Sequence, residues 1–420
     1  MHLEHWIEAL EQRSPDCLEA EFEIVTPMFI GDGDQQARSI RSASVKGALR
    51  FWWRALNWGR CLNQQQGDTR LALNQLHREE SRLFGAAAKT QEVSGVSQTV
   101  GGQGLFSLKI SQQEAPKPLS GWSPSSGTQY LLGQGLWNFK TKLSRPPLQP
   151  GARFQLQLSA RLPITPSEES AWQQLEQAVM AFGLLGGLGT RARKGLGSIS
   201  LLRISGGRLK APANRQEYSQ TLQALFSTCE LLQHFPPFSA LSGYSRLDIS
   251  AQGKEPLALL EQLGSEQQLY RSWGNNGKVA GQAAERNFTD DHDQAQLATQ
   301  GQQPKQVPQR AVFGLPHNYF FSSTKAKVDI HVKKDAAGER RASPLLIHLH
   351  RFADGQCLAV QLLLPAVFLP GQRPQLEYKA GRTFTLDFPQ QAVNWGVVAG
   401  YLDRFNARET LLASKLQGVA

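Results

Sequence analysis

The chain has 420 residues, of which 19% are charged and 40% hydrophobic, a balance typical of a globular protein with two or three domains. Its net charge of +10 favours an anionic partner, such as a nucleic acid, an anionic membrane or an acidic protein. The four cysteines form no CxxC pair, which argues against a disulfide framework and a zinc site. The sequence contains no apolar run of about 18 residues, so no membrane span is predicted. Because the first residues also lack the apolar core of a signal peptide, we expect a cytoplasmic protein without a membrane partner.

The predicted elements of the first half follow the order β-α-β-β-α-β. Alternating apolar residues predict four strands, over 21–30, 105–110, 152–161 and 199–204. Three helices are expected between them: one from Ser44 as N-cap, one over 69–82 that stops at Gly85, and one from the capping box Thr165–Glu168. The stretches 90–103 and 112–128 are predicted to be loops, and 130–142 a short strand or hairpin arm. The first half therefore predicts a ferredoxin-like, RRM-like βαββαβ domain with insertions.

A similar order recurs in the second half. The predicted elements are a helix over 213–234, a strand over 244–250, a helix over 256–273, a hairpin over 343–351 and 356–364, a strand over 382–388 and a helix over 392–412. The Gln- and Asn-rich stretch 275–309 is expected to be a mobile loop. We predict an α+β protein of two ferredoxin-like domains from an old duplication, over 1–212 and 241–420, with a bridging helix within 213–240.

The helix expected from Ser44 carries a basic stripe beside its apolar one. Lys46, Arg50 and Arg54 recur at i, i+4 and i+8, and like charges at this spacing cost a helix about 0.2–0.5 kcal/mol per pair. No carboxylate lies nearby in the sequence, so an anion from outside the segment is the simplest compensation. The apolar stripe consists of Val45, Ala48, Leu49, Trp52 and Leu56.

Arginine and tryptophan together suit single-stranded RNA, because arginine pairs with phosphate and aromatic rings stack on bases. Trp52 lies on the apolar stripe and is expected in the core. Trp53 and Trp58 are compatible with the core and with RNA contact.

The second candidate is the glycine-rich segment Gly183–Ser198, which surrounds Arg191, Arg193 and Lys194. Glycines let a backbone approach phosphates closely and present amides to them. The segment is not a Walker loop, because neither GxxxxGKS nor GxxxxGKT occurs. It is not a dinucleotide fingerprint either, because it follows a helix and precedes a strand. A glycine turn with solvated charges is the alternative.

Three further features are weaker. Residues 115–167 hold six basic residues and no acid, which fits an arm along a nucleic acid and equally a solvated loop. Asp290–Asp293 resembles a metal cluster by composition but has no spaced partner, so we expect no metal and no cofactor. His348 and His350 share one face of a strand and are expected to be exposed or packed; no histidine is expected near the glycine-rich segment.

Several motifs together resemble a known family. They are TPMFIGDGD (26–34), SVKGALRFWWRAL (44–56), LFG (83–85), GLLGGLGTRARKGLGS (183–198), VFGLP (312–316), RRASPLLIH (340–348) and FLP (368–370). This set resembles the RAMP superfamily of CRISPR-associated proteins, and within it the subunit-one family of the type III-B Cmr effector. The resemblance spans nearly the whole chain.

The resemblance implies two ferredoxin-like domains and a non-catalytic subunit of a ribonucleoprotein that uses a CRISPR guide RNA to find target RNA. Such a subunit caps the complex near the 3′ part of the guide, helps capture target RNA and contacts other Cmr subunits. Carried over by position, the RNA-binding candidates are Lys46, Arg50, Arg54, Trp58, Gly187, Gly189, Arg191, Arg193, Lys194, Arg340 and Arg341. The second half lacks a full glycine-rich loop after its last helix, which departs from the family pattern.

Two other functions stay open. One is a RAMP endoribonuclease that processes the guide RNA with a histidine as acid or base. The other is a purely structural subunit held by protein contacts. In a βαββαβ fold the first helix starts beside the end of the first strand, and the glycine-rich segment precedes the last strand, which neighbours the first. We therefore expect Lys46 to share a phosphate with the glycine-rich segment, and Arg54 to face a partner subunit.

Overall fold

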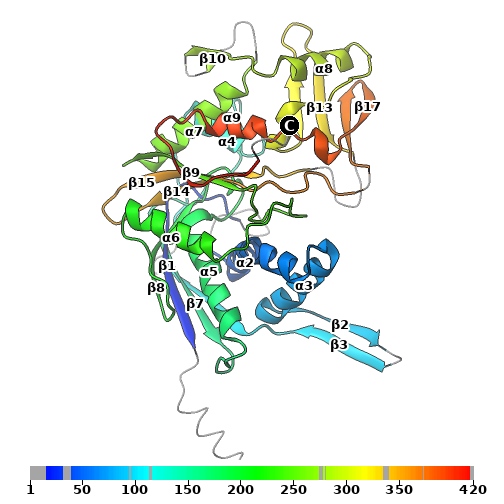
Figure 1. Cartoon of the computed structure of the whole chain (residues 1–420). Coiled ribbons are helices and arrows are strands. Elements are labelled where there is room, and N and C mark those ends of the chain that lie inside the picture. Colours follow the sequence, from blue (N-terminus) through cyan, green and yellow to red (C-terminus); the bar gives the residue numbers. More distant parts are fainter. Residues whose placement is uncertain are drawn as a thin grey trace, which may run out of the picture. The chain divides into compact units, whose positions relative to one another are not determined.

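The computed structural model describes residues 16–31, 39–93, 96–112, 116–273, 278–279, 281–333, 340–371 and 373–416 (Figure 1). The chain forms two compact units. The first unit contains Met1–Trp122, Leu143–Leu232 and His348–Cys357, and the second contains Ser123–Lys142, Gln233–Ile347 and Leu358–Ala420. Within the described ranges, no helix has the length and apolar character needed to cross a membrane.

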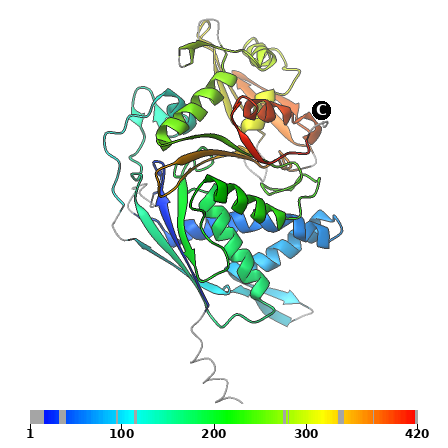
Figure 2. The ribbon, with the colours of Figure 1, turned by 60° about the vertical axis from the view of Figure 1, so that its left-hand side comes forward.

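The first unit contains a four-stranded antiparallel sheet with the strand order β4-β7-β1-β8. Its strands are β1 (Cys17–Ile24), β4 (Phe106–Gln112), β7 (Arg153–Ala160) and β8 (Ile199–Ser205). Helices α2 (Ser42–Gln64) and α3 (Thr69–Phe84) follow β1, and α5 (Glu169–Leu185) joins β7 to β8. This connectivity confirms the predicted ferredoxin-like βαββαβ domain. Helices α2 and α5 cover one face of the sheet (Figure 2).

The core of this unit forms where β1 meets its neighbours. Every second side chain of β1 is buried, because successive residues of a strand point to opposite faces of the sheet. The Phe22 ring stacks on Phe154 of β7 with 5.1 Å between ring centroids, and it lies 5.4 Å from the ring of Phe182 in α5. These three rings join the two central strands to the helix layer.

Helix α2 begins earlier than predicted. Its N-cap is Arg41, whose backbone is extended with φ −90° and ψ 139°, and no side chain caps this end. The Arg41 guanidinium donates instead to the carbonyl of Gly31 at 2.9 Å. The predicted Ser44 cap is therefore wrong, because Ser44 already lies inside the first helical turn.

Helix α3 has the predicted bounds within two residues. Asp68 caps it by accepting a hydrogen bond from the Leu71 amide at 2.9 Å. The helix stops at Gly85, whose φ of 80° and ψ of 158° suit only glycine. A Cβ at Gly85 would also lie 2.8 Å from the carbonyl oxygen of Gly102. The predicted stop is thus confirmed, and a close backbone approach adds to it.

A hairpin replaces the predicted loop over 90–103. Strands β2 (Ala86–Val93) and β3 (Val96–Gly102) pair antiparallel and extend from the first unit (Figure 1). The segment AAAKTQEV contains no alternation of apolar and polar residues. Sequence periodicity therefore gave no strand signal here.

The second ferredoxin-like domain has the strand order β14-β15-β9-β18, which matches the first sheet position by position. Its strands are β9 (Arg246–Gly253), β14 (Leu345–Arg351), β15 (Cys357–Leu363) and β18 (Glu409–Leu412), and its helices are α7 (Pro256–Tyr270) and α9 (Gly396–Leu402). A second sheet, of order β12-β13-β16-β17, is inserted between these elements. It consists of β12 (His317–Phe320), β13 (Lys327–Val332), β16 (Gln375–Ala380) and β17 (Arg382–Asp387). The predicted duplication of the fold is confirmed.

The end of the chain differs from the prediction. Only Gly396–Leu402 of the helix predicted over 392–412 is helical, and the chain then turns into β18. The Arg404 guanidinium at this turn donates to the carboxylates of Glu266 and Glu285 at 2.9 and 2.7 Å. The strand predicted over 382–388 exists as β17, but it belongs to the inserted sheet.

The remaining elements are short. They are α4 (Ser126–Leu132), β5 (Trp137–Asn138), β6 (Lys142–Leu143), α6 (Arg215–Ser227), β10 (Lys278–Val279), β11 (Gln282–Ala283), α8 (Thr289–Thr299), η1 (Gln309–Phe313) and η2 (Gln390–Ala392). The β5–β6 pair confirms the hairpin arm expected over 130–142. Helix α6 is shorter than the helix predicted over 213–234. The stretch 275–309, predicted as a loop, contains α8; residues 275–277 and 280 of it lie outside the described ranges.

Candidate nucleic-acid interface

The basic stripe of α2 meets a buried carboxylate from α3. Glu80 Oε1 accepts from Arg50 Nε at 2.5 Å and from Arg54 Nη1 at 2.9 Å. The Glu80 side chain is 4% exposed, whereas the two arginines are 34% and 36% exposed. The compensating anion thus comes from outside the segment, as expected, and it is a carboxylate of the same chain. One carboxylate neutralises one of two guanidinium charges, and the trio keeps a net charge of +1.

Lys46 lies one turn before this trio. It is half-buried, and burial lowers the pKa of its ammonium group, with Arg50 and Arg161 lowering it further through charge repulsion. Arg161 follows β7 and is exposed. Its guanidinium donates to the carbonyl of Gly104 at 3.2 Å. Three cations from two elements thus converge near the start of α2, where an anion would relieve their repulsion.

Trp58 belongs to the core and not to the RNA-facing set. Its side chain is 1% exposed, as is that of Trp53, so a nucleotide base cannot stack on either ring. The following residue, Gly59, lies so close to another chain segment that a Cβ would come within 1.7 Å of the Glu230 carbonyl oxygen. The carboxyl-terminal half of α2 is covered by protein, and the assignment of Trp58 to RNA binding is corrected.

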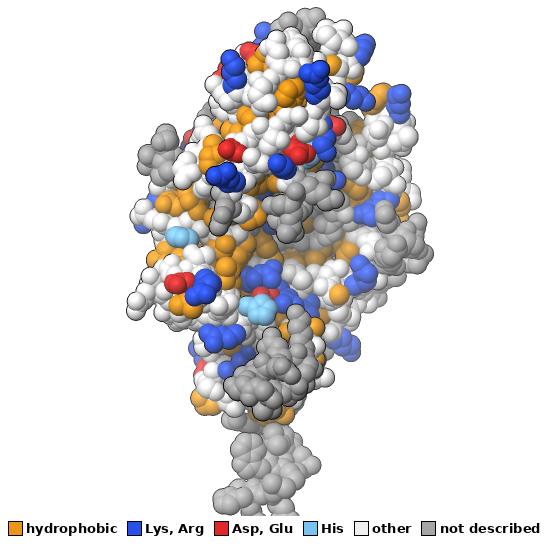
Figure 3. All heavy atoms as spheres, turned by 90° about the vertical axis from the view of Figure 1, so that its right-hand side faces the viewer, with side chains coloured by type: hydrophobic (Ala, Val, Ile, Leu, Met, Phe, Trp, Pro, Cys, Tyr) orange, Lys and Arg blue, Asp and Glu red, His pale blue; other side chains and the backbone are white. Residues whose placement is uncertain are grey.

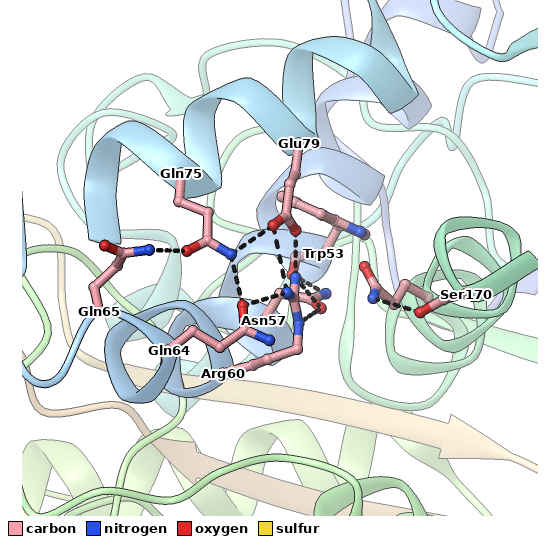
Figure 4. Close-up of polar contacts among 9 residues, drawn as sticks. Trp53, Asn57, Arg60, Gln64, Gln65, Gln75, Glu79 and Ser170 are labelled. Atoms are coloured by element: carbon pink, nitrogen blue, oxygen red, sulfur yellow. Dashed lines mark hydrogen bonds and ion pairs between the residues drawn. The ribbon is translucent and has the colours of Figure 1, made fainter. Parts of the chain in front are cut away.

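A polar network also joins α2 to α3 near the carboxyl-terminal end of α2 (Figure 4). Arg60 forms an ion pair with Glu79, and Gln75 donates to Gln64 and to Glu79 at 2.6 and 2.7 Å. Burial alone would raise the pKa of the Glu79 carboxyl, but the hydrogen bonds from Arg60 and Gln75 outweigh it and lower that pKa. The network fixes the angle between the helices and so the position of Glu80 against α2.

The glycines of the segment after α5 serve close backbone packing. Gly189 has φ 89°, and a Cβ on it would lie 2.6 Å from the carbonyl oxygen of Phe29. A Cβ on Gly187 would lie 2.7 Å from the carbonyl oxygen of Gly197. The Thr190 amide donates to the Phe29 carbonyl at 2.9 Å, which holds the segment against the chain that follows β1. Packing therefore accounts for both glycines, whether or not RNA contacts them.

The base of this glycine-rich loop is fixed by buried hydroxyl groups. Thr26 Oγ1 donates to the Gly195 carbonyl at 2.6 Å and accepts from the Ser198 amide at 2.9 Å. Ser198 Oγ donates to the same carbonyl at 3.0 Å. The loop is thereby held as a rigid turn whose tip carries the basic residues.

The tip of the loop contacts α2. The Arg193 guanidinium lies 5.3 Å from the centroid of the Phe51 ring, a cation–π geometry. Arg191 is exposed with φ 67°, and Lys194 is half-buried. Arg145, one of the six basic residues of the stretch 115–167, donates to Thr190 Oγ1 at 2.7 Å. The loop and α2 therefore form one surface, joined through Phe51.

This surface is the candidate interface, and we call it the α2–loop surface. Its basic residues come from four parts of the first unit: Lys46, Arg50 and Arg54 of α2; Arg145 after β6; Arg161 after β7; and Arg191, Arg193 and Lys194 of the glycine-rich loop. The charges that lower the pKa of Lys46 are those of Arg50 in α2 and Arg161 after β7. The expectation that Lys46 shares a phosphate with the glycine-rich loop therefore stays a prediction. Figure 3 shows Lys and Arg side chains spread over one face of the molecule, with fewer patches of Asp and Glu between them.

The second-unit candidates differ in exposure. Arg340 is exposed. Arg341 is half-buried, with its guanidinium 5.3 Å from the Phe368 ring centroid, and its backbone pairs with Leu315. Of these two candidates, only Arg340 is exposed to solvent.

Two histidines lie close to the glycine-rich loop, contrary to expectation. His348 Nδ1 donates to the Gly186 carbonyl at 2.8 Å, and the His350 ring centroid lies 5.9 Å from that of His348. They are 2% and 0% exposed. Burial lowers the pKa of His348 to about 3 and that of His350 well below its usual range. Both rings are neutral and sealed from solvent, so they are packed residues.

The aspartate cluster has a structural role. Asp291 is 2% exposed, and its carboxylate accepts hydrogen bonds from the Gln309 and Arg310 amides at 2.7 and 2.9 Å. The Arg310 Nε lies 3.1 Å from the same carboxylate. Among the described residues, no group of three His, Cys, Asp or Glu side chains could hold a metal ion.

Comparison with known proteins relates this fold to one superfamily. Residues 21–200 match the RAMP superfamily. Over 189 residues the chain is 26% identical to the CRISPR system Cmr subunit Cmr1-2 of Pyrococcus furiosus, covering 43% of this chain and 92% of that protein. The solved structure of apo Cmr1 from Pyrococcus furiosus is similar with a TM-score of 0.49 and 17% identity, covering 94% of this chain and 99% of that chain. A chain of the type III-B Cmr-beta complex bound to cognate target RNA is similar with a TM-score of 0.48 and 10% identity, covering 94% and 99%. Residues 21–200 are thus similar to RAMP superfamily proteins, and the chain resembles the Cmr1-2 subunit of a CRISPR Cmr system.

Proposed function

We propose that this chain is a non-catalytic, RNA-binding subunit of a cytoplasmic type III-B CRISPR ribonucleoprotein. Its partners are the CRISPR guide RNA, the target RNA and the other Cmr subunits. It caps the complex near the 3′ part of the guide RNA and helps to capture target RNA. The observation that carries the proposal is the α2–loop surface, where the Arg193 guanidinium lies 5.3 Å from Phe51 of the basic helix.

The charge of the α2–loop surface suits a phosphate backbone. Glu80 offsets only one of the two guanidinium charges that it contacts. It also holds Arg50 and Arg54 in fixed positions, so less side-chain entropy is lost when a phosphate binds. Burial, followed by repulsion from Arg50 and Arg161, lowers the pKa of the Lys46 ammonium group, and an incoming phosphate would relieve that repulsion. These features support backbone recognition, which positions RNA without reading its sequence.

Burial of the histidines supports the non-catalytic assignment. A general acid or base must reach within hydrogen-bonding distance of the 2′-hydroxyl or the leaving group. His348 and His350 are 2% and 0% exposed, although His348 lies beside the glycine-rich loop. Incubating the purified protein with CRISPR repeat RNA without metal tests this point. Defined cleavage products would favour the endoribonuclease.

The main test replaces Arg191, Arg193 and Lys194 together with alanine. Affinity for single-stranded RNA falls with salt by a logarithmic slope of about −0.7 per neutralised phosphate. The slope for the assembled complex should therefore flatten by about 0.7 for each lost phosphate contact. Alanine at Arg203, Arg208 and Lys210 is the matched control, because it removes the same formal charge from exposed positions of the first unit. An equal flattening in both variants, or none in the first, would remove the loop from the RNA site.

A further inference from the structure

The second unit carries an aromatic and basic projection that the α2–loop surface does not include. It follows α4, which is anchored on α7 by an unusually close helix contact. A Cβ on Gly264 would come within 2.1 Å of the Gly127 carbonyl oxygen, and one on Gly127 within 2.4 Å of the Glu261 carbonyl oxygen. Both positions therefore require glycine, and α4 cannot shift without losing this packing.

A single carboxylate caps the start of α4. Glu261 of α7 accepts hydrogen bonds from the amides of Gly127 and Thr128 at 2.8 and 2.7 Å, and from the Ser125 and Thr128 hydroxyls at 2.5 and 3.0 Å. Burial raises the pKa of Glu261, but these donors outweigh it and lower that pKa. The carboxylate is therefore charged and directed into the helix end, so α4 is a rigid base.

Beyond α4 the chain forms a small hairpin over residues 137–142, which we call the finger. Asn138 Oδ1 accepts from the amides of Lys140 and Thr141 at 2.9 and 3.4 Å, which fixes the turn. Phe139 at the tip is 73% exposed, the highest value among the large apolar side chains that the structure describes. The ring is therefore accessible to a partner, and the lysines beside it indicate the charge of that partner.

Each aromatic ring of the finger has a lysine against it. Lys140 Nζ lies 5.8 Å from the centroid of Phe139, and Lys142 Nζ lies 5.7 Å from the centroid of Trp137. No Asp or Glu occurs between Glu114 and Glu168 in the sequence. The finger therefore offers aromatic faces and positive charge without a carboxylate from its own segment, which disfavours a basic partner and favours an anionic one.

We propose that the finger binds single-stranded RNA by stacking one or two unpaired bases on Phe139 and Trp137. This inference rests on the proposed RNA-binding function and adds a second contact to it, on the second unit. Stacking of a base on an aromatic ring is stronger than an exposed cation–π pair. An incoming base therefore displaces each lysine from its ring, and the lysine turns to the adjacent phosphate. Unpaired bases are required, because a duplex hides both faces of each base.

The test measures how tightly the full chain binds a fluorescent oligouridylate and, separately, a double-stranded RNA of equal length. Phe139→Ala should weaken oligouridylate binding about tenfold, the usual range for loss of one stacked base. Phe139→Trp should retain the affinity. Phe320→Ala is the matched control, because Phe320 is also a phenylalanine of the second unit and is 60% exposed. It should leave binding unchanged, and duplex binding should be unaffected by all three substitutions.

The outcomes separate this inference from the proposed function. If Phe139→Ala leaves oligouridylate affinity unchanged while alanine at Arg191, Arg193 and Lys194 weakens it, the finger does not stack RNA but the α2–loop surface stands. An equal loss on duplex RNA overturns stacking. Unchanged RNA affinity combined with loss of complex assembly would make the finger a protein contact instead. Absence of oligouridylate binding by the unmodified chain also overturns the inference.

Discussion

Replacing Glu80 with glutamine removes the charge that holds Arg50 and Arg54 against α3. Glutamine has nearly the same shape and can still accept one hydrogen bond, so the change isolates the charge. The two arginines then repel each other across one helical turn, with the buried partner gone. We expect the variant to fold and to be less stable than the unmodified chain.

The size of the effect follows from exposure. Removing one member of a fully buried ion pair costs about 3–5 kcal/mol. Glu80 is 4% exposed, but its partners are 34% and 36% exposed and remain partly solvated. Screening therefore reduces the expected loss to about 2 kcal/mol. For a unit of this size, that corresponds to a fall of about 4–8 °C in the unfolding midpoint.

Thermal and urea unfolding of the full chain measure this loss. Glu169→Gln is the control, because its ion pair with Arg208 has side chains 52% and 69% exposed; we expect at most about 1 kcal/mol. When Arg50 and Arg54 are both replaced by methionine, Glu80 becomes an unpaired buried charge, so Glu80→Gln should then be neutral or stabilising. An equal loss in both backgrounds would refute the reasoning, because Glu80 would then act independently of the two arginines.

Three further predictions concern the fold around the α2–loop surface. Gly189→Ala should destabilise the chain by about 1–3 kcal/mol, because its φ is 89° and a Cβ would lie 2.6 Å from the Phe29 carbonyl oxygen. Gly67→Ala is the control in the unfolding experiment, because Gly67 has a similar φ of 87° but open space around an added Cβ. Trp58→Ala should cost about 3–5 kcal/mol in unfolding experiments, and a loss of RNA affinity without this loss of stability would contradict its place in the core. His348 has a lowered folded-state pKa, so the unfolded chain takes up the proton first and stability is lost as pH falls from about 6.5 towards about 3. At pH 5 this linkage lowers the free energy of unfolding by about 2 kcal/mol. His348→Asn should therefore make the free energy of urea unfolding less dependent on pH. An unchanged pH dependence would show that the His348 ring is accessible to solvent.

The order of elements was enough to predict both ferredoxin-like domains. The topology depends on where strands and helices occur and not on their exact ends, and connections between such elements follow few routes. The prediction failed where a strand is short or has no apolar alternation. The strand Glu409–Leu412 continues an apparently helical pattern, and the turn before it depends on Arg404, whose partners Glu266 and Glu285 lie far away in the sequence.

The sequence of α3 contains a pattern that predicts the burial of Glu80. Ala72, Leu76 and Leu83 are buried on one face of α3, and Glu80 occupies the same face four residues after Leu76. A glutamate within an apolar helical stripe indicates a buried partner of opposite charge. The basic stripe of α2 supplies such partners, but the pairing itself depends on tertiary structure.

The tryptophans could not be assigned from one stripe. Helix α2 packs against both α3 and α5, so its buried surface is wider than a single apolar stripe. Trp53 and Trp58 are buried on this wider surface. Conversely, Phe51 became a candidate only because the fold brings it to the glycine-rich loop, and the position of Arg145 beside that loop could not be predicted. Such contacts join residues far apart in the sequence and leave no local pattern.

Mapping of RNA–protein crosslinks by mass spectrometry in the assembled ribonucleoprotein tests the RNA-binding role of the α2–loop surface most directly. Ultraviolet light joins bases to side chains that they touch, so the method reports contact in the intact complex. We expect crosslinked peptides that contain the segments 46–54 and 189–194. Crosslinks confined to other parts of the chain, with both of these segments recovered unmodified, would contradict the role proposed for this surface.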